Sequence, residues 1–152
     1  MLVKEILRIK GNTLYTVTPA TLLSDAVITL AEHDIGSVLV MESGKLAGML
    51  TFREVIKVLA KRQQEHRIGP TPTMSEIKVG DVLDPTPALA NPDMEVDELR
   101  SLMLERHQRY VPVMEEETVL GVISFHDVAK AVLEEQAFEN RMLKGYIKNW
   151  PA

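Results

Sequence analysis

The sequence predicts an α+β fold that consists of two β-α-β-β-α repeats and a C-terminal helical extension. When the 152-residue chain is shifted against itself by 73 residues, its halves align without a gap from Pro19 and Pro92 onward, which indicates an internal repeat. Within each half, short β-rich runs alternate with apolar residues at helical spacing. The composition, 45% hydrophobic and 26% charged residues, is that of a globular chain with a core.

The repeat is supported by identities and by a matching apolar phase. Upstream of Pro19 the register slips, because residues 3–7 match residues 79–83 at a spacing of 76, so the first copy carries three extra residues near Lys10-Gly11-Asn12. Identical pairs at the spacing of 73 include Glu32/Glu105, Val38/Val111, Val40/Val113, Met41/Met114, Gly48/Gly121, Phe52/Phe125 and Val55/Val128.

Each repeat is expected to open with a short helix, at residues 3–7 and 79–83, and to continue into an extended segment that ends at Pro19 or Pro92. Proline suits the edge of a sheet, since it has no N–H to donate to a central ladder. A helix follows, because apolar residues recur on one helical face. They are Leu23, Ala26, Val27, Leu30 and Ala31 in the first repeat, and Val96, Leu99, Met103 and Leu104 in the second.

A β-hairpin and a closing helix complete each repeat. In the first, strands at 37–41 and 45–51 flank a turn in which Gly44 can adopt a positive φ. In the second, strands at 110–114 and 118–124 flank an acidic turn. The apolar face of the closing helix contains Phe52, Val55, Ile56, Leu59 and Ala60 in the first repeat, and Phe125, Val128, Ala129, Val132 and Leu133 in the second.

These elements divide the chain into repeat 1 at residues 1–62, a linker at 63–77, repeat 2 at 78–135 and a C-terminal helical extension at 136–152. The linker is polar and rich in Gly and Pro at 69–73, as loops are. In the extension, Phe138, Met142, Tyr146 and Trp150 recur every four residues, with Leu143 and Ile147 beside them. This stripe either packs against its own domain or contacts a second subunit, and the sequence leaves both alternatives open.

Composition argues against several classes of protein. A net charge of −5 disfavours nucleic acid as a partner, since such binding rests on Lys and Arg neutralising phosphates. The chain has no cysteine, hence no disulfide, thiol nucleophile or Cys-ligated metal. No apolar run approaches the roughly 18 residues of a membrane span, and residues 1–8 do not resemble a signal peptide. We therefore expect a soluble, cytoplasmic protein with no membrane partner.

Catalytic signatures are also missing. The four histidines show no metal-ligand spacing, so no metal site is expected. There is no Gly-x-x-x-x-Gly-Lys-Ser/Thr loop for P-loop hydrolysis. A nucleotide hydrolase or transferase would need a general base and usually a metal, and neither is recognisable. We therefore expect no enzymatic activity and no catalytic cofactor.

A hydroxyl and a carboxylate three residues apart follow each hairpin, as Thr51-Phe52-Arg53-Glu54 and Ser124-Phe125-His126-Asp127. One interpretation is a helix cap alone, which contributes about 1 kcal/mol and needs no ligand. The other is ligand binding, because a helix N-terminus favours anions. The hydroxyl would then donate to a phosphate, and the carboxylate would accept from two ribose hydroxyls. Two copies would give two related clefts.

Several stretches together carry a resemblance to a known family. They are Thr16-Val17-Thr18-Pro19, Ser37-Val38-Leu39-Val40, Tyr110-Val111-Pro112-Val113 and the closing motifs at residues 48–54 and 121–127. From about residue 3 to about residue 133, the chain resembles a tandem pair of CBS domains, or Bateman module, of the stand-alone bacterial type. The resemblance implies repeats packed through their sheets as a pseudo-two-fold pair with two clefts. Such clefts commonly bind AMP, ADP, ATP, NAD or S-adenosylmethionine, and two modules often form a disc-like homodimer.

The same resemblance assigns expected roles to the motif residues. Asp127 would bind the ribose diol and Ser124 the phosphate, while Thr51 matches the phosphate hydroxyl of the first copy. Glu54 departs from the family's usual aspartate, which makes the second motif the stronger candidate. Leu89 stands where the first copy has Thr16, which again predicts unequal clefts.

Further candidates come from the rest of each repeat. The wall around the base is expected from Val38, Tyr110, Val111 and Pro112, with polar groups from Thr16 and Thr18. The positive charge for phosphates is expected from Arg53, Arg109, Arg106 or His126, with Arg53 and His126 favoured because each lies close to a helix start.

The sequence therefore predicts a regulatory module that binds an adenosine-containing nucleotide between its repeats and signals through its conformation or dimer arrangement. For this to work, the ligand must bind two arrangements with different affinity. No effector domain is recognisable, so the output would pass to an unknown effector protein or to the oligomeric state. The alternatives are a structural or protein-interaction module whose motifs are only helix caps, and, less favoured, a nucleotide-processing enzyme.

Overall fold

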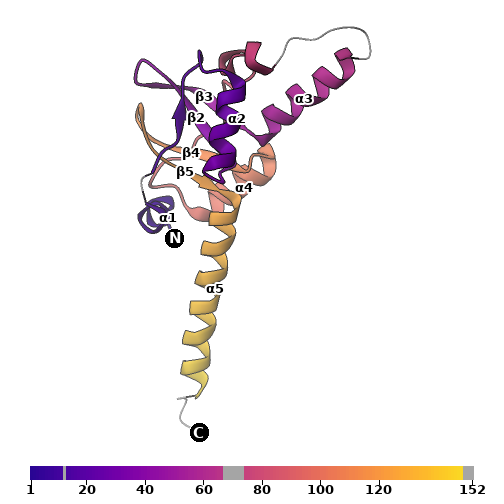
Figure 1. Cartoon of the computed structure of the whole chain (residues 1–152). Coiled ribbons are helices and arrows are strands. Elements are labelled where there is room, and N and C mark those ends of the chain that lie inside the picture. The colour runs from indigo at the N-terminus through magenta and orange to yellow at the C-terminus, as the bar shows by residue number, and fades with distance from the viewer. Residues whose placement is uncertain (12, 67–73, 149–152) are drawn as a thin grey trace.

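A computed structural model describes residues 1–11, 13–66 and 74–148 of the chain (Figure 1). Two small sheets lie together in the body of the molecule, helices pack around them, and the last helix projects away from the body. The elements in order are α1 (Val3–Lys10), β1 (Thr16–Val17), α2 (Leu23–Glu32), β2 (Ser37–Glu42), β3 (Lys45–Thr51), α3 (Phe52–His66), the 3-10 turns η1 (Met74–Glu76) and η2 (Val79–Asp81), α4 (Val96–Arg106), β4 (Tyr110–Glu115), β5 (Thr118–Ser124) and α5 (Phe125–Lys148).

The first repeat forms the predicted three-stranded sheet. Its order is β1-β2-β3, with β1 parallel to β2 and β2 antiparallel to β3. The β2–β3 turn has positive φ at Ser43 (53°) and Gly44 (77°), which is the turn geometry that follows the right-handed twist of a hairpin. The expected hairpin of the second repeat is also present, as antiparallel β4 and β5.

The opening strand expected in the second repeat is reduced to a single parallel bridge between Ala90 and Val113. The reason is that Pro112 stands where β2 has Leu39, whose N–H donates to the Tyr15 carbonyl at 3.0 Å, and proline has no N–H to donate to the equivalent Ala88 carbonyl. Gln108 satisfies the Ala88 backbone instead. Its side-chain Oε1 accepts the backbone N–H of Ala88 at 2.8 Å, and its Nε2 donates to the Ala88 carbonyl at 2.9 Å. A side-chain amide thus takes the place of strand partners at this position, and the two repeats differ beside the predicted clefts.

The opening segment of each repeat packs into the core of the other repeat. Val3, Ile6 and Leu7 of α1 are buried in the cluster that contains α4, β4 and β5. In exchange, Val79 of η2 is buried in the cluster of α2, β2 and β3. The prediction of a helix at 79–83 is wrong, since the segment forms only a 3-10 turn at Val79–Asp81. This exchange interlocks the two repeats, so neither core is complete without residues from the other.

The glycine repeated in both closing motifs permits this exchange. At Gly48, an added Cβ would lie 2.3 Å from the Asp84 carbonyl oxygen, because Met49 and Asp84 exchange two backbone hydrogen bonds of 2.9 Å. At Gly121, an added Cβ would lie 2.8 Å from Leu7 Cδ2. Both glycines thus allow a segment of the other repeat to approach the sheet closely.

The predicted continuation of the last helix is confirmed, since α5 runs without interruption from Phe125 to Lys148. Of the two alternatives for its apolar stripe, packing against its own domain is not what the structure shows, because Phe138 and Met142 are 56% and 62% exposed. Leu143, Tyr146 and Ile147 are exposed as well, and α5 points away from the two sheets (Figure 1). Trp150 lies outside the described residues, as does the Gly- and Pro-rich part of the predicted linker.

Candidate functional site

The first motif, at the β3–α3 junction, forms a capping box. Glu54 Oε1 accepts the backbone N–H of Thr51 at 2.7 Å and the Thr51 hydroxyl at 2.8 Å. Thr51 Oγ1 in turn accepts the backbone N–H of Arg53 at 3.1 Å. The longer acid folds back along its own chain, and only 9% of Glu54 is exposed. The carboxylate is therefore committed mainly to its own helix end.

The second motif, at the β5–α5 junction, combines a cap with an ion pair. Asp127 Oδ2 accepts the backbone N–H of Ser124 at 2.8 Å, and Ser124 Oγ accepts the backbone N–H of Asp127 at 3.1 Å. The same Oδ2 also binds Lys10 Nζ at 2.6 Å. Lys10 donates in addition to the Val122 carbonyl at 2.8 Å, so the last residue of α1 is anchored at the end of β5.

These contacts determine the protonation of Asp127. Partial burial by itself raises the pKa of this carboxyl, but the hydrogen bond from Lys10, the backbone N–H of Ser124 and the positive charge of Lys10 together lower the pKa below its ordinary value. Asp127 is thus ionised at neutral pH and is the natural acceptor for donors that approach this helix end.

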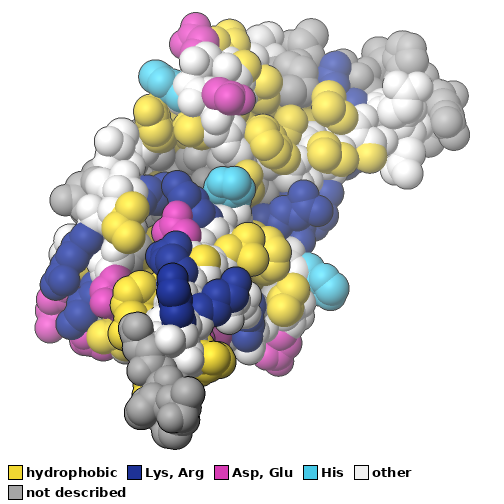
Figure 2. Space-filling model, turned by 90° about the horizontal axis from the view of Figure 1, so that it is seen from below, with side chains coloured by type: hydrophobic (Ala, Val, Ile, Leu, Met, Phe, Trp, Pro, Cys, Tyr) yellow, Lys and Arg dark blue, Asp and Glu magenta, His cyan; other side chains and the backbone are white. Residues whose placement is uncertain are grey.

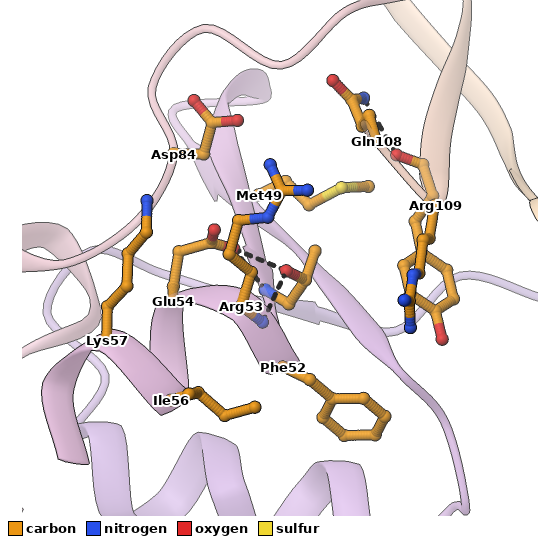
Figure 3. A pocket seen from close by; sticks show the side chains of 11 residues that line it. Met49, Phe52, Arg53, Glu54, Ile56, Lys57, Asp84, Gln108 and Arg109 are labelled. Carbon is orange, nitrogen blue, oxygen red and sulfur yellow. Dashed lines mark hydrogen bonds between the residues drawn. The ribbon is translucent and has the colours of Figure 1, made fainter. Parts of the chain in front are cut away.

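A first cavity of about 360 Å³ opens beside the first motif (Figure 3). Glu54 and Lys57 of α3 lie on one side of it, and Gln108 and Arg109 lie on the other. Its wall thus joins the closing motif of repeat 1 to the segment that leads into β4 in repeat 2. The main polar residues that line it are Thr51, Arg53, Glu54, Lys57, Asp84, Gln108, Arg109 and Tyr110.

A second cavity of about 790 Å³ opens beside the second motif. Here the closing motif of repeat 2 faces the segments before β1 and β2 of repeat 1, so the arrangement of the first cavity recurs with the repeats exchanged. Its lining includes Lys10, Thr13, Tyr15, Asp34, Gly36, Arg109, Tyr110, Ser124 and His126.

Tyr110 stands at the wall of both cavities. A Cβ added to Gly36 would lie 1.8 Å from the Tyr110 hydroxyl oxygen, so the phenol ring rests directly on the backbone of the other repeat. Tyr110 is half-buried. Only glycine at position 36 leaves room for the ring in this place, and the ring therefore connects the two repeats where the cavities meet.

Positive charge is present at both cavities. Arg53 donates to the His107 carbonyl and so reaches from α3 to the loop after α4. The second cavity has Lys10, Arg109 and the imidazole of His126 against Asp34. The first has Arg53, Lys57 and Arg109 against Glu54 and Asp84. On the face seen in Figure 2, Lys and Arg side chains gather between two lobes of the molecule.

The predicted site residues fall into two groups. Thr51, Glu54 and Arg53 line the first cavity, Ser124 and His126 line the second, and Arg109 and Tyr110 line both. Asp127 lies directly beside Ser124 without lining the second cavity. The other predictions, Val38, Val111, Pro112, Thr16 and Thr18, are not among the residues that line these cavities.

The alternation of side chains along a strand explains why residues predicted to surround the base do not line the cavities. Val38 and Val111 point into the two hydrophobic cores and are almost completely buried. Their neighbours face the other way, so Leu39 lines the second cavity and Tyr110 lines both, as the two-residue period of a strand requires. Pro112 is buried opposite Val122 within the β4–β5 hairpin.

Thr16 and Thr18 also lie away from the lining of the two cavities, because each makes contacts within its own repeat. Thr16 pairs with Leu39 in the sheet. Thr18 donates its backbone N–H to Thr21 Oγ1 at 3.0 Å, within the turn that precedes α2. The residues just upstream, Thr13 to Tyr15, line the second cavity instead.

Four residues that line the cavities were not predicted from the sequence, namely Lys10, Gly36, Asp84 and Gln108. The repeat register offered one signal, since Gly36 corresponds to Arg109 at the spacing of 73. Lys10 lies in the three-residue insertion of the first copy. This difference between the two repeats was the only sequence feature that distinguished Lys10 from other surface lysines. Its contact with Asp127 required the exchange of α1 between the repeats.

Two further features bear on the kind of site. Within the described parts of the chain, no group of three or more His, Asp or Glu side chains is arranged to hold a metal ion. In the same residues, no helix has the length and apolar character needed to cross a membrane.

Comparison with known proteins places these features in a family. The model of the CBS domain matches residues 3–61 and 79–134. A mitochondrial CBS domain-containing protein of Arabidopsis thaliana, CBSX3, is 27% identical over 143 residues, which cover 91% of this chain and 65% of that protein. The chain therefore spans about two thirds of the length of this relative.

Solved structures agree with the family match. The CBS-domain protein ATU1752 of Agrobacterium tumefaciens is 30% identical, with a TM-score of 0.76 and coverage of 86% of this chain and 98% of that one. Two chains similar in fold were solved with ligands. They are CBSX2 in complex with AMP (22% identity, TM-score 0.66, 81% of this chain and 90% of that one), and the CBS pair of MJ0100 with 5′-methylthioadenosine and S-adenosylmethionine (21%, 0.74, 89% and 98%).

Proposed function

This chain belongs to the CBS-domain family, and we propose that it is a regulatory module that binds adenosine-containing ligands in the two cavities between its repeats. The observation that carries the proposal is the placement of the repeated motif. Each strand end, hydroxyl and helix N-terminus opens onto a cavity whose opposite wall belongs to the other repeat. A ligand that touches both walls would stabilise one arrangement of the repeats over another.

The second cavity and its edge offer groups suited to a nucleotide. The N-terminus of α5 and the Ser124 hydroxyl would bind a phosphate. Ionised Asp127, which lies beside Ser124 outside the lining of the cavity, would accept from the ribose hydroxyls at this edge. Tyr110 offers an aromatic surface for the base. Lys10, Arg109 and His126 would supply positive charge. This charge favours AMP, ADP, ATP or NAD over S-adenosylmethionine, whose sulfonium is a cation.

The ligand complexes of CBSX2 and MJ0100 support the ligand class. Their ligands differ in charge and in the group attached to the ribose, but all contain adenosine. Since these chains resemble the present one at the level of fold, they support an adenosine-containing ligand without selecting among the candidates.

A thermal-shift screen tests the proposal. At a concentration about 100 times its dissociation constant, a ligand adds roughly 2.7 kcal/mol of stability, so AMP, ATP or NAD should raise the Tm by about 5–10 °C. Asp127→Ala should remove most of this rise and cost about 1 kcal/mol through the lost cap. The matched control is Asp97→Ala, because Asp97 lies on the exposed face of α4.

Two outcomes would favour the alternatives. If no adenosine compound shifts the Tm at millimolar concentration and Asp127→Ala costs only the cap, the protein is an interaction module without a ligand. If ATP or NAD is bound but steadily converted, as followed by chromatography of the nucleotides, the protein is an enzyme. We expect stoichiometric retention without turnover.

We further propose a homodimer in which a second copy covers the exposed stripe of α5. Leu143 and Ile147 lie four residues apart on one helical face and are 59% and 65% exposed. A stripe of large apolar side chains of this kind typically marks an interface. Leu143→Glu should reduce the dimer fraction in light scattering, whereas Lys144→Glu on the adjacent polar face should not. An unchanged mass for Leu143→Glu would refute this interface.

A further inference from the structure

The two cavities share part of their lining. Among the described residues that line them, only Arg109 and Tyr110 belong to both. Arg109 is exposed, and its carbonyl accepts the backbone N–H of Phe125 at 2.7 Å. This bond fixes the Arg109 backbone at the N-terminus of α5, while the side chain stays long, flexible and always charged.

We propose that Arg109 is an anion-binding residue of both cavities and serves one cavity at a time, so that a phosphate-bearing ligand in one cavity weakens binding in the other. The proposal rests on the proposed function and adds to it a coupling between the sites. One guanidinium has a single charge and one planar fork of donors. When the fork grips a phosphate in one cavity, that charge and geometry are lost to the other.

Apart from Arg109, the charges of the lysine, arginine and acidic side chains at each cavity nearly balance. In the first cavity, Arg53 and Lys57 stand against Glu54 and Asp84. In the second, Lys10 stands against Asp34, and its ammonium is already paired with Asp127. Arg109 is therefore the additional cation of either cavity, and the cavity that a phosphate ligand fills first draws it away from the other.

Tyr110 adds a mechanical connection to the electrostatic one. Its ring rests on Gly36 of the second cavity and also lines the first. A ligand that displaces the ring in one cavity therefore changes the shape of the other. Coupling through Tyr110 is independent of ligand charge, whereas coupling through Arg109 requires an anion, and this difference allows the two contributions to be separated.

Calorimetric titration of the full chain with AMP and with uncharged adenosine tests the proposal. For AMP, we expect two events whose affinities differ by about 5-fold or more beyond the difference seen for adenosine. In Arg109→Met, the tighter AMP event should weaken, and the difference between the two events should fall to the adenosine value. Arg106→Met is the matched control, since Arg106 lines neither cavity and should leave both events unchanged.

Each other outcome has a defined meaning. If neither AMP nor adenosine binds the wild-type protein, the proposed function fails before the coupling is reached. If both bind but the AMP difference persists in Arg109→Met, the coupling proposal is overturned. A single AMP event in the wild type would overturn the coupling whatever Arg109→Met shows, because the proposal requires AMP to bind both cavities.

Discussion

The two closing motifs have the same plan but use their carboxylates differently. Glu54 accepts both the amide and the hydroxyl of Thr51, so the acid and the hydroxyl are bound to each other. Asp127 accepts the amide of Ser124 and the ammonium of Lys10, while the Ser124 hydroxyl accepts the backbone N–H of Asp127. Both carboxylates thus accept from their own helix end, but only Asp127 also faces a cation from the other repeat, because Lys10 belongs to the insertion that the second repeat lacks. The two repeats share the backbone device but not its charged partner.

The largest effect that separates the two motifs is expected at their glycines. Gly48→Ala places a Cβ 2.3 Å from a backbone carbonyl, whereas Gly121→Ala meets only the tip of the Leu7 side chain at 2.8 Å. Backbone cannot move away as a side chain can. Gly48→Ala should therefore cost about 1–3 kcal/mol, and Gly121→Ala clearly less. Urea unfolding of both variants measures this, and equal costs would contradict the difference in packing.

A smaller effect is expected from the ion pair that only the second motif has. The pKa of Asp127 is lowered in the folded chain, so its contribution to stability is present above the unfolded pKa of about 4 and is lost as the pH falls through the folded pKa. Lys10→Met should cost about 0.5–1 kcal/mol at pH 7, since the pair is partly exposed. The two proteins should converge in acid, where Asp127 is protonated.

The pH series needs a matched control. Lys61→Met removes a lysine that pairs with Glu65 on the surface of α3 and should leave the acid limb of the stability curve almost unchanged. A Lys10→Met variant whose deficit is the same at every pH would show that Lys10 acts through packing rather than through the charge of Asp127.

The smallest effect is expected from exchanging the acid of the first motif. Glu54→Asp keeps the cap, because Asp127 shows that an aspartate reaches the equivalent backbone N–H at 2.8 Å. The stability should change by less than about 1 kcal/mol. The shorter acid would release the Thr51 hydroxyl for a phosphate, so AMP binding at the first cavity should strengthen in calorimetry. A weaker or unchanged first cavity would show that acid length does not set the difference between the motifs.

The sequence predicted the repeats, the hairpins, both caps and the continuous last helix, because these depend on local periodicity and on capping residues. It also placed Thr51, Ser124, Arg109 and Tyr110 among the site residues, and all four line a cavity. Side-chain direction was harder to predict. Val38 and Val111 were expected at the ligand wall, but a strand turns alternate side chains to opposite faces, and these two side chains lie in the hydrophobic cores.

The sequence by itself thus determined that two copies of one helix-capping device exist and that their acids differ. The tertiary structure decided what each device faces. Lys10 is 117 residues from Asp127 along the chain, and the two meet only because α1 packs into the core of the second repeat. Arg109 and Tyr110 border both cavities for the same reason, since long-range packing rather than local sequence sets which segments of the two repeats lie together.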